Sequence, residues 1–296
     1  MALYLPLRLA FVRMDLKLVV TDLDGTLLDA RGHCPAANRC ALERLGELGV
    51  VRAVATGRSP YSARLTLPEG FPIDYLIFSS GAGVMRWPEG EVLAAQHLDD
   101  STARGLVGLL STHGVDFMVH GPIPRNHEFR FRATGSPAPD FVRRLERYAG
   151  HASPLLDGEP LGQVSQLVGI IAGDPVRFAD IARRVRGASV VRSTSPLDGS
   201  SIWIELFALG VSKGSGVGWL CRHLGGIAPQ QVLLLGNDYN DLDMLRGMPH
   251  AYVVANAPAE LLRQFPSVPS NVEAGFAQLV QRVVLGDSMK CVNHKE

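Results

Sequence analysis

The 296-residue sequence has no net charge, no cysteine motif and no long uninterrupted apolar run. Lys plus Arg and Asp plus Glu each number 29, so no overall field draws the chain to nucleic acid or to an anionic membrane. The cysteines contain no CxxC pair and no metal-ligand spacing, and we expect free thiols in a reducing, cytoplasmic setting. They are Cys34, Cys40, Cys221 and Cys291. The sequence does not indicate an oligomeric state.

The N-terminal residues 1–13 are apolar, but Pro6, Arg8 and Arg13 interrupt them. This segment is too short to span a bilayer and lacks the small-residue cleavage site of a signal peptide. Met14 stands directly before the first predicted strand. We interpret 1–13 as a poorly ordered extension, with an interfacial anchor as the alternative.

Two parts of the chain alternate strands and helices in the order that a parallel sheet requires. The first part contains predicted strands at 16–21, 50–55 and 75–78, with a helix at about 35–48. The second contains predicted helices at 213–224 and about 276–284, with strands at 232–235 and 252–255. We therefore predict an α/β protein with a Rossmann-like, doubly wound parallel-sheet core formed by 14–98 and 200–296.

The stretch 99–199 has a different rhythm, in which helices and pairs of strands alternate. Predicted strands lie at 115–119, 128–132, 166–171 and 189–192, and predicted helices include 101–113. Asp174 and Pro175 are the N-cap and first residue of another helix. This pattern predicts an inserted α+β domain with an open, largely antiparallel sheet and its helices on one face.

Asp22-Leu23-Asp24-Gly25-Thr26 directly follows the first predicted strand. Two carboxylates that stand two residues apart at the end of a buried strand can act as nucleophile and proton shuttle beside one cation. A simple Asp-Gly turn is the alternative for this segment alone. Ligands in open parallel sheets lie beyond the carboxyl ends of the strands, which favours the chemical interpretation.

Further candidate phosphate-binding groups follow later strands. Thr56, Gly57 and Arg58 offer a hydroxyl, free backbone amides and a cation after the second strand, although an ordinary turn is the alternative. Lys213 opens a helix, where the positive helix dipole disfavours a cation unless an anion binds there. A solvated lysine is the alternative.

The loop 236–241 collects several oxygen ligands immediately after the strand 232–235. Asn237, Asp238, Asn240 and Asp241 all lie within it, and a turn that only caps a helix would need one or two of these groups. Such a loop suits a hard cation such as Mg²⁺.

Taken together, DxDGT, TGR, the late lysine and this acidic loop resemble, in this order, the haloacid dehalogenase superfamily of phosphohydrolases. The resemblance covers about 15–285, and the insertion is similar to the C2-type cap of the Cof-like sugar phosphatases. It implies that Asp22 becomes an aspartyl-phosphate and that Asp24 protonates the leaving group and then activates water. It also implies a bound Mg²⁺, held by the Asp22 carboxylate and the Asp24 main-chain carbonyl.

The same resemblance implies a phosphoryl site formed by Thr56, the Leu23 and Gly57 amides, Lys213 and Asn240. One position departs from the pattern, because Asn237 stands where the family usually has a metal-ligating aspartate. Asn can supply a neutral oxygen ligand, or Asp238 or Asp241 could take this role. We expect Mg²⁺ dependence to persist with a weaker metal affinity.

The resulting hypothesis is an enzyme, a Mg²⁺-dependent phosphatase that acts on a small phosphorylated metabolite, with a sugar phosphate as the expected substrate. Alternatives are a glycosyl-phosphate phosphatase of the sucrose-phosphate or mannosyl-phosphoglycerate type, and a catalytically weak phosphosugar- or nucleotide-binding protein. A basic cluster in the insertion either faces the active site or lines a solvated strand face. Its members are His120, Arg125, His127, Arg130 and Arg132.

Overall fold

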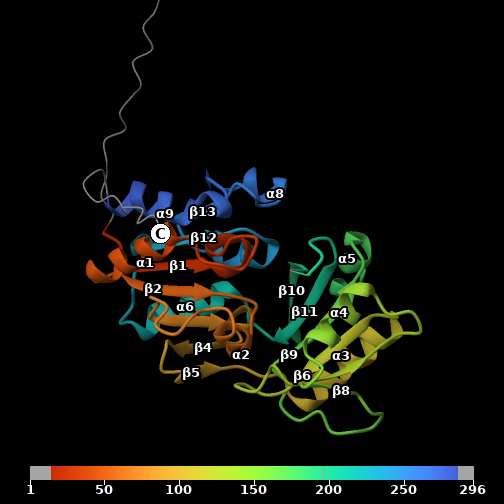
Figure 1. The fold of residues 1–296 in the computed structure, drawn as a ribbon. Helices are drawn as coiled ribbons and strands as arrows, with labels where there is room; N and C mark the ends of the chain where they lie inside the picture. The colour runs from red at the N-terminus through yellow and green to blue at the C-terminus, as the bar shows by residue number, and fades with distance from the viewer. Residues whose placement is uncertain (1–14, 196, 286–296) are drawn as a thin grey trace, which may run out of the picture.

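A computed structural model describes residues 15–195 and 197–285, and it divides them between two sheets (Figure 1). The larger sheet has eight strands in the order β14-β13-β12-β1-β2-β3-β4-β5. Its strands are parallel except at β3-β4 and β4-β5, which pair antiparallel. The strands are β1 (Leu18–Asp22), β2 (Val51–Ala55), β3 (Tyr75–Phe78), β4 (Gly83–Arg86), β5 (Val92–Ala95), β12 (Val232–Gly236), β13 (His250–Val254) and β14 (Ser267–Val268).

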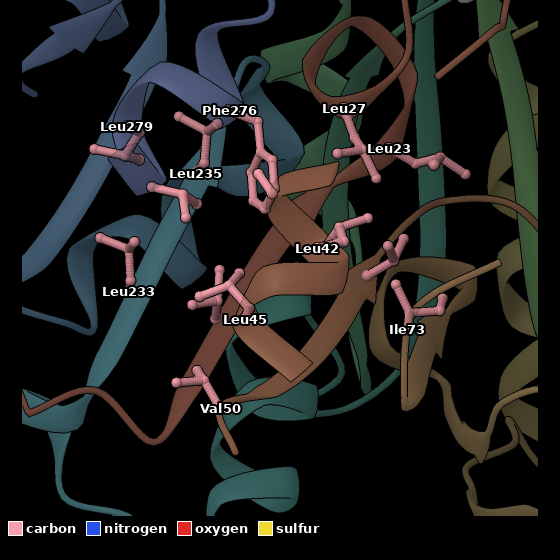
Figure 2. Packing of buried hydrophobic residues seen from close by; sticks show 14 of the residues in the cluster. Leu23, Leu27, Leu42, Leu45, Val50, Ile73, Leu233, Leu235, Phe276 and Leu279 are labelled. Atoms are coloured by element: carbon pink, nitrogen blue, oxygen red, sulfur yellow. The ribbon is translucent and has the colours of Figure 1, made fainter. Parts of the chain in front are cut away.

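Helices cover both faces of this sheet because its strands are apolar on both sides. On one face, Leu42 and Leu45 of α1 pack with Phe276 and Leu279 of α9 against β1 and β12 (Figure 2). Helices α6 and α7 cover the other face. The core helices are α1 (Ala36–Glu47), α2 (Pro60–Arg64), α6 (Lys213–His223), α7 (Leu242–Arg246), α8 (Ala259–Leu262) and α9 (Gly275–Val280).

The smaller sheet has six strands in the order β10-β11-β9-β6-β7-β8 and forms the cap. All its pairs are antiparallel except β7-β8. Its strands are β6 (Asp116–His120), β7 (Phe129–Arg132), β8 (Ala152–Pro154), β9 (Gln166–Ile171), β10 (Ala188–Thr194) and β11 (Ile202–Ala208). Its helices are α3 (Asp100–Thr112), α4 (Pro139–Arg147) and α5 (Pro175–Arg184).

The predicted α/β class, with a parallel core sheet and an inserted α+β unit, is confirmed. Two predicted details of the cap differ from the structure. Strand β11 pairs with β9 and β10, so the cap sheet extends past the predicted boundary at residue 199. Helix α4 packs through Phe141 on the sheet face opposite to α3 and α5, so the cap helices do not share one face.

The cysteine prediction is confirmed in part. Cys34 and Cys221 are free thiols, but Cys40 is disulfide-bonded, which removes part of the argument for a reducing compartment. Cys291 and the predicted extension 1–13 lie outside the described residues. In the part of the chain that is described, no helix has the length and apolar character needed to cross a membrane.

Candidate active site

The predicted site residues converge at the carboxyl ends of three adjacent parallel strands. Strand β1 lies between β12 and β2, with Thr21 opposite both Leu235 and Val54. Asp22 ends β1, Thr56 directly follows β2, and the loop 237–241 follows β12. The structure thus brings together segments that are about 200 residues apart in the sequence, as an open parallel sheet requires.

Asp22 and Asp241 share the buried ammonium group of Lys213. The Lys213 Nζ lies 2.6 Å from Asp22 Oδ1 and 2.7 Å from Asp241 Oδ1. Burial raises the pKa of Asp22 to about 7, although Lys213 opposes this shift. Burial alone would lower the pKa of Lys213, but the two carboxylates raise it above its ordinary value. Lys213 is therefore a fixed positive charge beside the predicted nucleophile.

The loop that carries Asp22 and Asp24 is held by side-chain amides. Gly25 has a φ of 76°, in the left-handed region that glycine adopts without strain. The Asn256 side chain donates a 2.8 Å hydrogen bond to the Gly25 carbonyl. Buried Asn38 and Asn271 donate to the carbonyls of Leu27 and Leu28, two and three residues further along the loop. These bonds fix the backbone on which both carboxylates depend.

Asp24 pairs with Arg58 rather than with Lys213. Arg58 donates from Nε to Asp24 Oδ2 and from Nη2 to Asp24 Oδ1, both at 2.7 Å. The remaining guanidinium nitrogen bonds Ser62 and Thr66 of the segment that follows. Arg58 is thus placed to orient the predicted proton shuttle. Its side-chain bonds are to Asp24, Ser62 and Thr66, and they do not by themselves indicate a role in phosphate binding.

The remaining predicted phosphate-binding groups surround the same point. The Thr56 hydroxyl accepts a hydrogen bond from the Arg58 amide, and Leu23 is buried directly beside Asp22. Gly57 lies beside the cap and the core, since an added Cβ would meet Ser80 Oγ at 3.6 Å and Glu205 Oε1 at 3.9 Å. The Asn240 Oδ1 atom is buried without a hydrogen-bond partner among the described residues. The roles of these groups stay predictions.

The two carboxylates of the acidic loop 236–241, those of Asp238 and Asp241, bond different partners. Asp241 accepts hydrogen bonds from the main-chain amides of Asn237 and Asp238, as well as from Lys213. The Asp238 carboxylate instead accepts bonds from the amide and hydroxyl of Thr194 in the cap, at 2.7 and 3.0 Å. Asn237 packs on the nucleophile loop, because a Cβ on Gly25 would lie 2.5 Å from its side-chain nitrogen.

These contacts indicate which groups could hold a cation. The Asp22 Oδ2 atom is buried without a partner among the described residues. No cluster of three His, Cys, Asp or Glu side chains suits a metal in those same residues. A cation would therefore depend on Asp22, a main-chain carbonyl such as that of Asp24, and the amide oxygen of Asn237. This set of oxygen donors fits Mg²⁺. Both oxygens of the Asp238 carboxylate already accept hydrogen bonds from Thr194.

The cap adds residues that the sequence analysis missed. Glu205 of β11 is buried and accepts hydrogen bonds from Ser80 of the core at 2.9 Å and from Ser193 of β10 at 2.6 Å. Burial raises the pKa of Glu205. Asn126 of the cap donates to Ser79 of the core at 2.8 Å. No local sequence pattern marks these pairs, because their partners are far apart in the chain.

The basic cluster in the cap is divided by the sheet. Arg132 pairs with Asp157, and Arg130 lies 3.5 Å from Glu159, so both pair with the cap loop between β8 and β9. His127 instead stacks on Tyr61 of the core, with ring centroids 4.3 Å apart. The cluster therefore does not act as one anion-binding face.

Comparison with known proteins supports the arrangement. Residues 19–279 match the family model of the haloacid dehalogenase-like hydrolases. The chain is 26% identical over 259 residues to an HMP-PP phosphatase of Citrobacter koseri, which covers 84% of this chain and 88% of that protein. An HMP-PP phosphatase of Cronobacter sakazakii is also 26% identical, over 251 residues, covering 84% and 87% of the two chains.

Solved structures share the fold. A haloacid dehalogenase superfamily phosphatase from Bacteroides thetaiotaomicron has a TM-score of 0.72 at 18% identity, over 94% of this chain and 98% of that one. A subclass IIB sugar phosphatase has a TM-score of 0.70 at 18% identity, over 89% and 97%.

The chain belongs to the haloacid dehalogenase-like hydrolases. The prediction of an enzyme of the phosphatase type is confirmed at this level.

Proposed function

We propose that this hydrolase is a Mg²⁺-dependent phosphatase that acts on a small phosphorylated metabolite, a sugar phosphate, through an aspartyl-phosphate on Asp22. The observation that carries the proposal is the buried Asp22–Lys213–Asp241 group at the end of β1. Positioning and charge neutralisation do most of the work in phosphoryl transfer, and this group supplies both.

Asp22 attacks phosphorus, while Lys213 holds its carboxylate at a fixed angle and neutralises charge on the transferred group. Asp24 protonates the departing oxygen, oriented by its two bonds to Arg58. Asp24 then takes a proton from the water that hydrolyses the acyl-phosphate, which returns Asp22 to its carboxylate form. Bound Mg²⁺, held by Asp22, the Asp24 carbonyl and Asn237, would neutralise phosphoryl charge.

HMP-PP is a second candidate substrate, because two relatives that each cover 84% of the chain are named HMP-PP phosphatase. A cytoplasmic location belongs to the proposal as well. It is supported by the free thiols Cys34 and Cys221, while the disulfide at Cys40 argues against it.

The test is phosphate release from sugar phosphates, HMP-PP and p-nitrophenyl phosphate, with Mg²⁺ and with a chelator. We expect turnover that needs Mg²⁺ and is abolished in Asp22→Asn. Turnover that survives in Asp22→Asn would refute the proposed nucleophile. No turnover of any phosphate ester would refute the phosphatase proposal in favour of a binding protein.

A further inference from the structure

The cap-sheet face that carries Glu205 is turned toward the core. Glu205 of β11 lies opposite Val168 of β9, and Gln166 lies two residues away, so all three point to one side of the sheet. His120 of β6 lies opposite Gln166 and shares this side. Because the Glu205 carboxylate bonds Ser80 of the core, this side of the sheet faces the proposed active site.

This face holds buried polar atoms that the proposed reaction does not use. His120 is 3% exposed and Gln166 is 5% exposed. The His120 Nε2 and Gln166 Oε1 atoms have no hydrogen-bond partner among the described residues. A buried polar atom without a partner costs free energy, so these two atoms, which lie opposite one another, need a water molecule or a ligand group to bond them.

Arg144 of α4 lies over the same face. Its guanidinium carbon is 4.6 Å from the ring centroid of Trp203 and 5.3 Å from that of Tyr148. Its Nε donates to the Met118 sulfur at 3.1 Å. Within 15–195 and 197–285 Arg144 makes no ion pair, unlike Arg58. The Glu205 and Asp140 carboxylates act on its charge, but neither forms an ion pair with it. A partly buried arginine without a direct carboxylate partner is uncommon in proteins.

Arg144 lies on the leaving-group side of the reaction. Trp203, on which Arg144 stacks, is two residues from Glu205 on β11 and points to the same side of the sheet. A Cβ on Gly57, the residue before Arg58, would lie 3.9 Å from Glu205 Oε1, so this side of the sheet reaches the Arg58 segment. Arg58 in turn holds Asp24, the group that would protonate the leaving oxygen. A leaving group that extends from Asp24 toward the cap therefore meets Tyr148 and Arg144.

We propose that Arg144 binds a second negatively charged group, a phosphate or a carboxylate, on the leaving group of the substrate. This inference rests on the proposed phosphatase function and narrows its substrate class to phosphate esters whose leaving group is itself an anion. His120 and Gln166 then bond polar groups of the same leaving group. Arg144 is thus a specificity-determining residue rather than a catalytic one.

The test compares matched pairs of compounds that differ in the charge of the leaving group. Glycerol phosphate against phosphoglycerate tests a carboxylate, and fructose monophosphate against fructose bisphosphate tests a second phosphate. Compounds that are not turned over are ranked as competitive inhibitors of p-nitrophenyl phosphate hydrolysis. We expect the wild-type enzyme to favour the anionic member of at least one pair.

Arg144→Gln should lower this preference about tenfold or more, mainly through KM, which is the effect of losing one charge-assisted hydrogen bond. Arg144→Lys keeps the charge and should keep part of the preference. Arg143→Gln, an exposed neighbour on the same helix, should keep all of it. Thermal unfolding shows whether each variant is folded.

An unchanged preference in folded Arg144→Gln, or a wild-type preference for the neutral member of both pairs, would overturn the inference while leaving the phosphatase function intact. Absence of hydrolysis of every phosphate ester, p-nitrophenyl phosphate included, would overturn both.

Discussion

Arg58 holds the Asp24 carboxylate through two parallel hydrogen bonds, each 2.7 Å long. Such bidentate pairs fix geometry as well as charge. Because Asp24 is the proposed proton donor, Arg58→Gln should reduce turnover most for substrates with a poorly leaving alkoxide. Asp24→Asn should lower kcat on such substrates by about 10²–10⁴-fold, the usual contribution of general acid catalysis. The measurement is kcat for an alkyl phosphate and for p-nitrophenyl phosphate.

If Arg58 works through Asp24, adding Arg58→Gln to Asp24→Asn should cost little more than Asp24→Asn alone. Arg64→Gln, at the end of the helix α2 that follows Arg58, is the control, because its side chain bonds the Pro88 carbonyl away from the site. Equal losses on both substrates in Arg58→Gln would contradict a role in proton transfer.

Replacing Lys213 should destabilise the fold as well as stop turnover. Lys213→Met leaves the buried Asp22 and Asp241 carboxylates without their shared cation. Removing one partner of a buried ion pair costs about 3–5 kcal/mol, which urea unfolding would measure. Added Mg²⁺ should restore part of this loss. Lys17→Met, an exposed change, is the control, and a Lys213→Met protein as stable as this control would contradict the account.

Substitutions of Asn237 and Asp238 should have different effects on Mg²⁺ affinity. Asn237→Asp adds a negative charge to the proposed ligand set and should tighten Mg²⁺ binding roughly tenfold, equivalent to about 1.4 kcal/mol. Asp238→Asn should change it little, because that carboxylate is bonded to Thr194. Titration calorimetry measures both. An unchanged or weaker affinity in Asn237→Asp would contradict the assignment, and a large loss in Asp238→Asn would move it to Asp238.

His120 should make the fold sensitive to acid. Burial, followed by the charge of Arg144, lowers its pKa from 6.5 to about 3, with His127 acting in the same direction. The unfolded chain therefore binds this proton below about pH 6.5 and the folded chain does not, so stability falls as pH drops from 6.5 toward 3. Each unit of pKa shift corresponds to about 1.4 kcal/mol.

His120→Asn keeps a donor near the Asn126 carbonyl and removes the titrating ring. Urea unfolding between pH 4 and 7, a range that covers most of the window from 3 to 6.5, should show a shallower pH dependence than in the wild type. A wild-type slope in His120→Asn would show that His120 is not the responsible group.

The core of the site was predictable because its chemistry lies within short segments at strand ends. Asp22 and Asp24, Thr56 to Arg58, and the loop 237–241 each follow an apolar run, and the parallel sheet brings them together. Lys213 was predictable from its unfavourable place at a helix N-terminus, and the structure shows the two carboxylates that offset this.

The cap side of the site was not predictable in the same way. Ser80 and Glu205 are 125 residues apart and belong to different sheets. The sequence pattern does not indicate the strand Ile202–Ala208, which carries Glu205, and it predicts a cap boundary before this strand. Thr194 of the cap, which bonds the Asp238 carboxylate, lies beside the loop of Asp238 only in three dimensions, so the sequence cannot show that Asp238 has this partner.

The most direct test of the account is the site of covalent phosphorylation. The wild-type enzyme is mixed with a hydrolysed substrate and Mg²⁺, quenched in acid and digested for peptide mass spectrometry. The account predicts a phosphoryl group on Asp22, absent from Asp22→Asn and longer-lived in Asp24→Asn. A phosphoryl group on another residue, or steady phosphate release with none on Asp22 at any quench time, would contradict it.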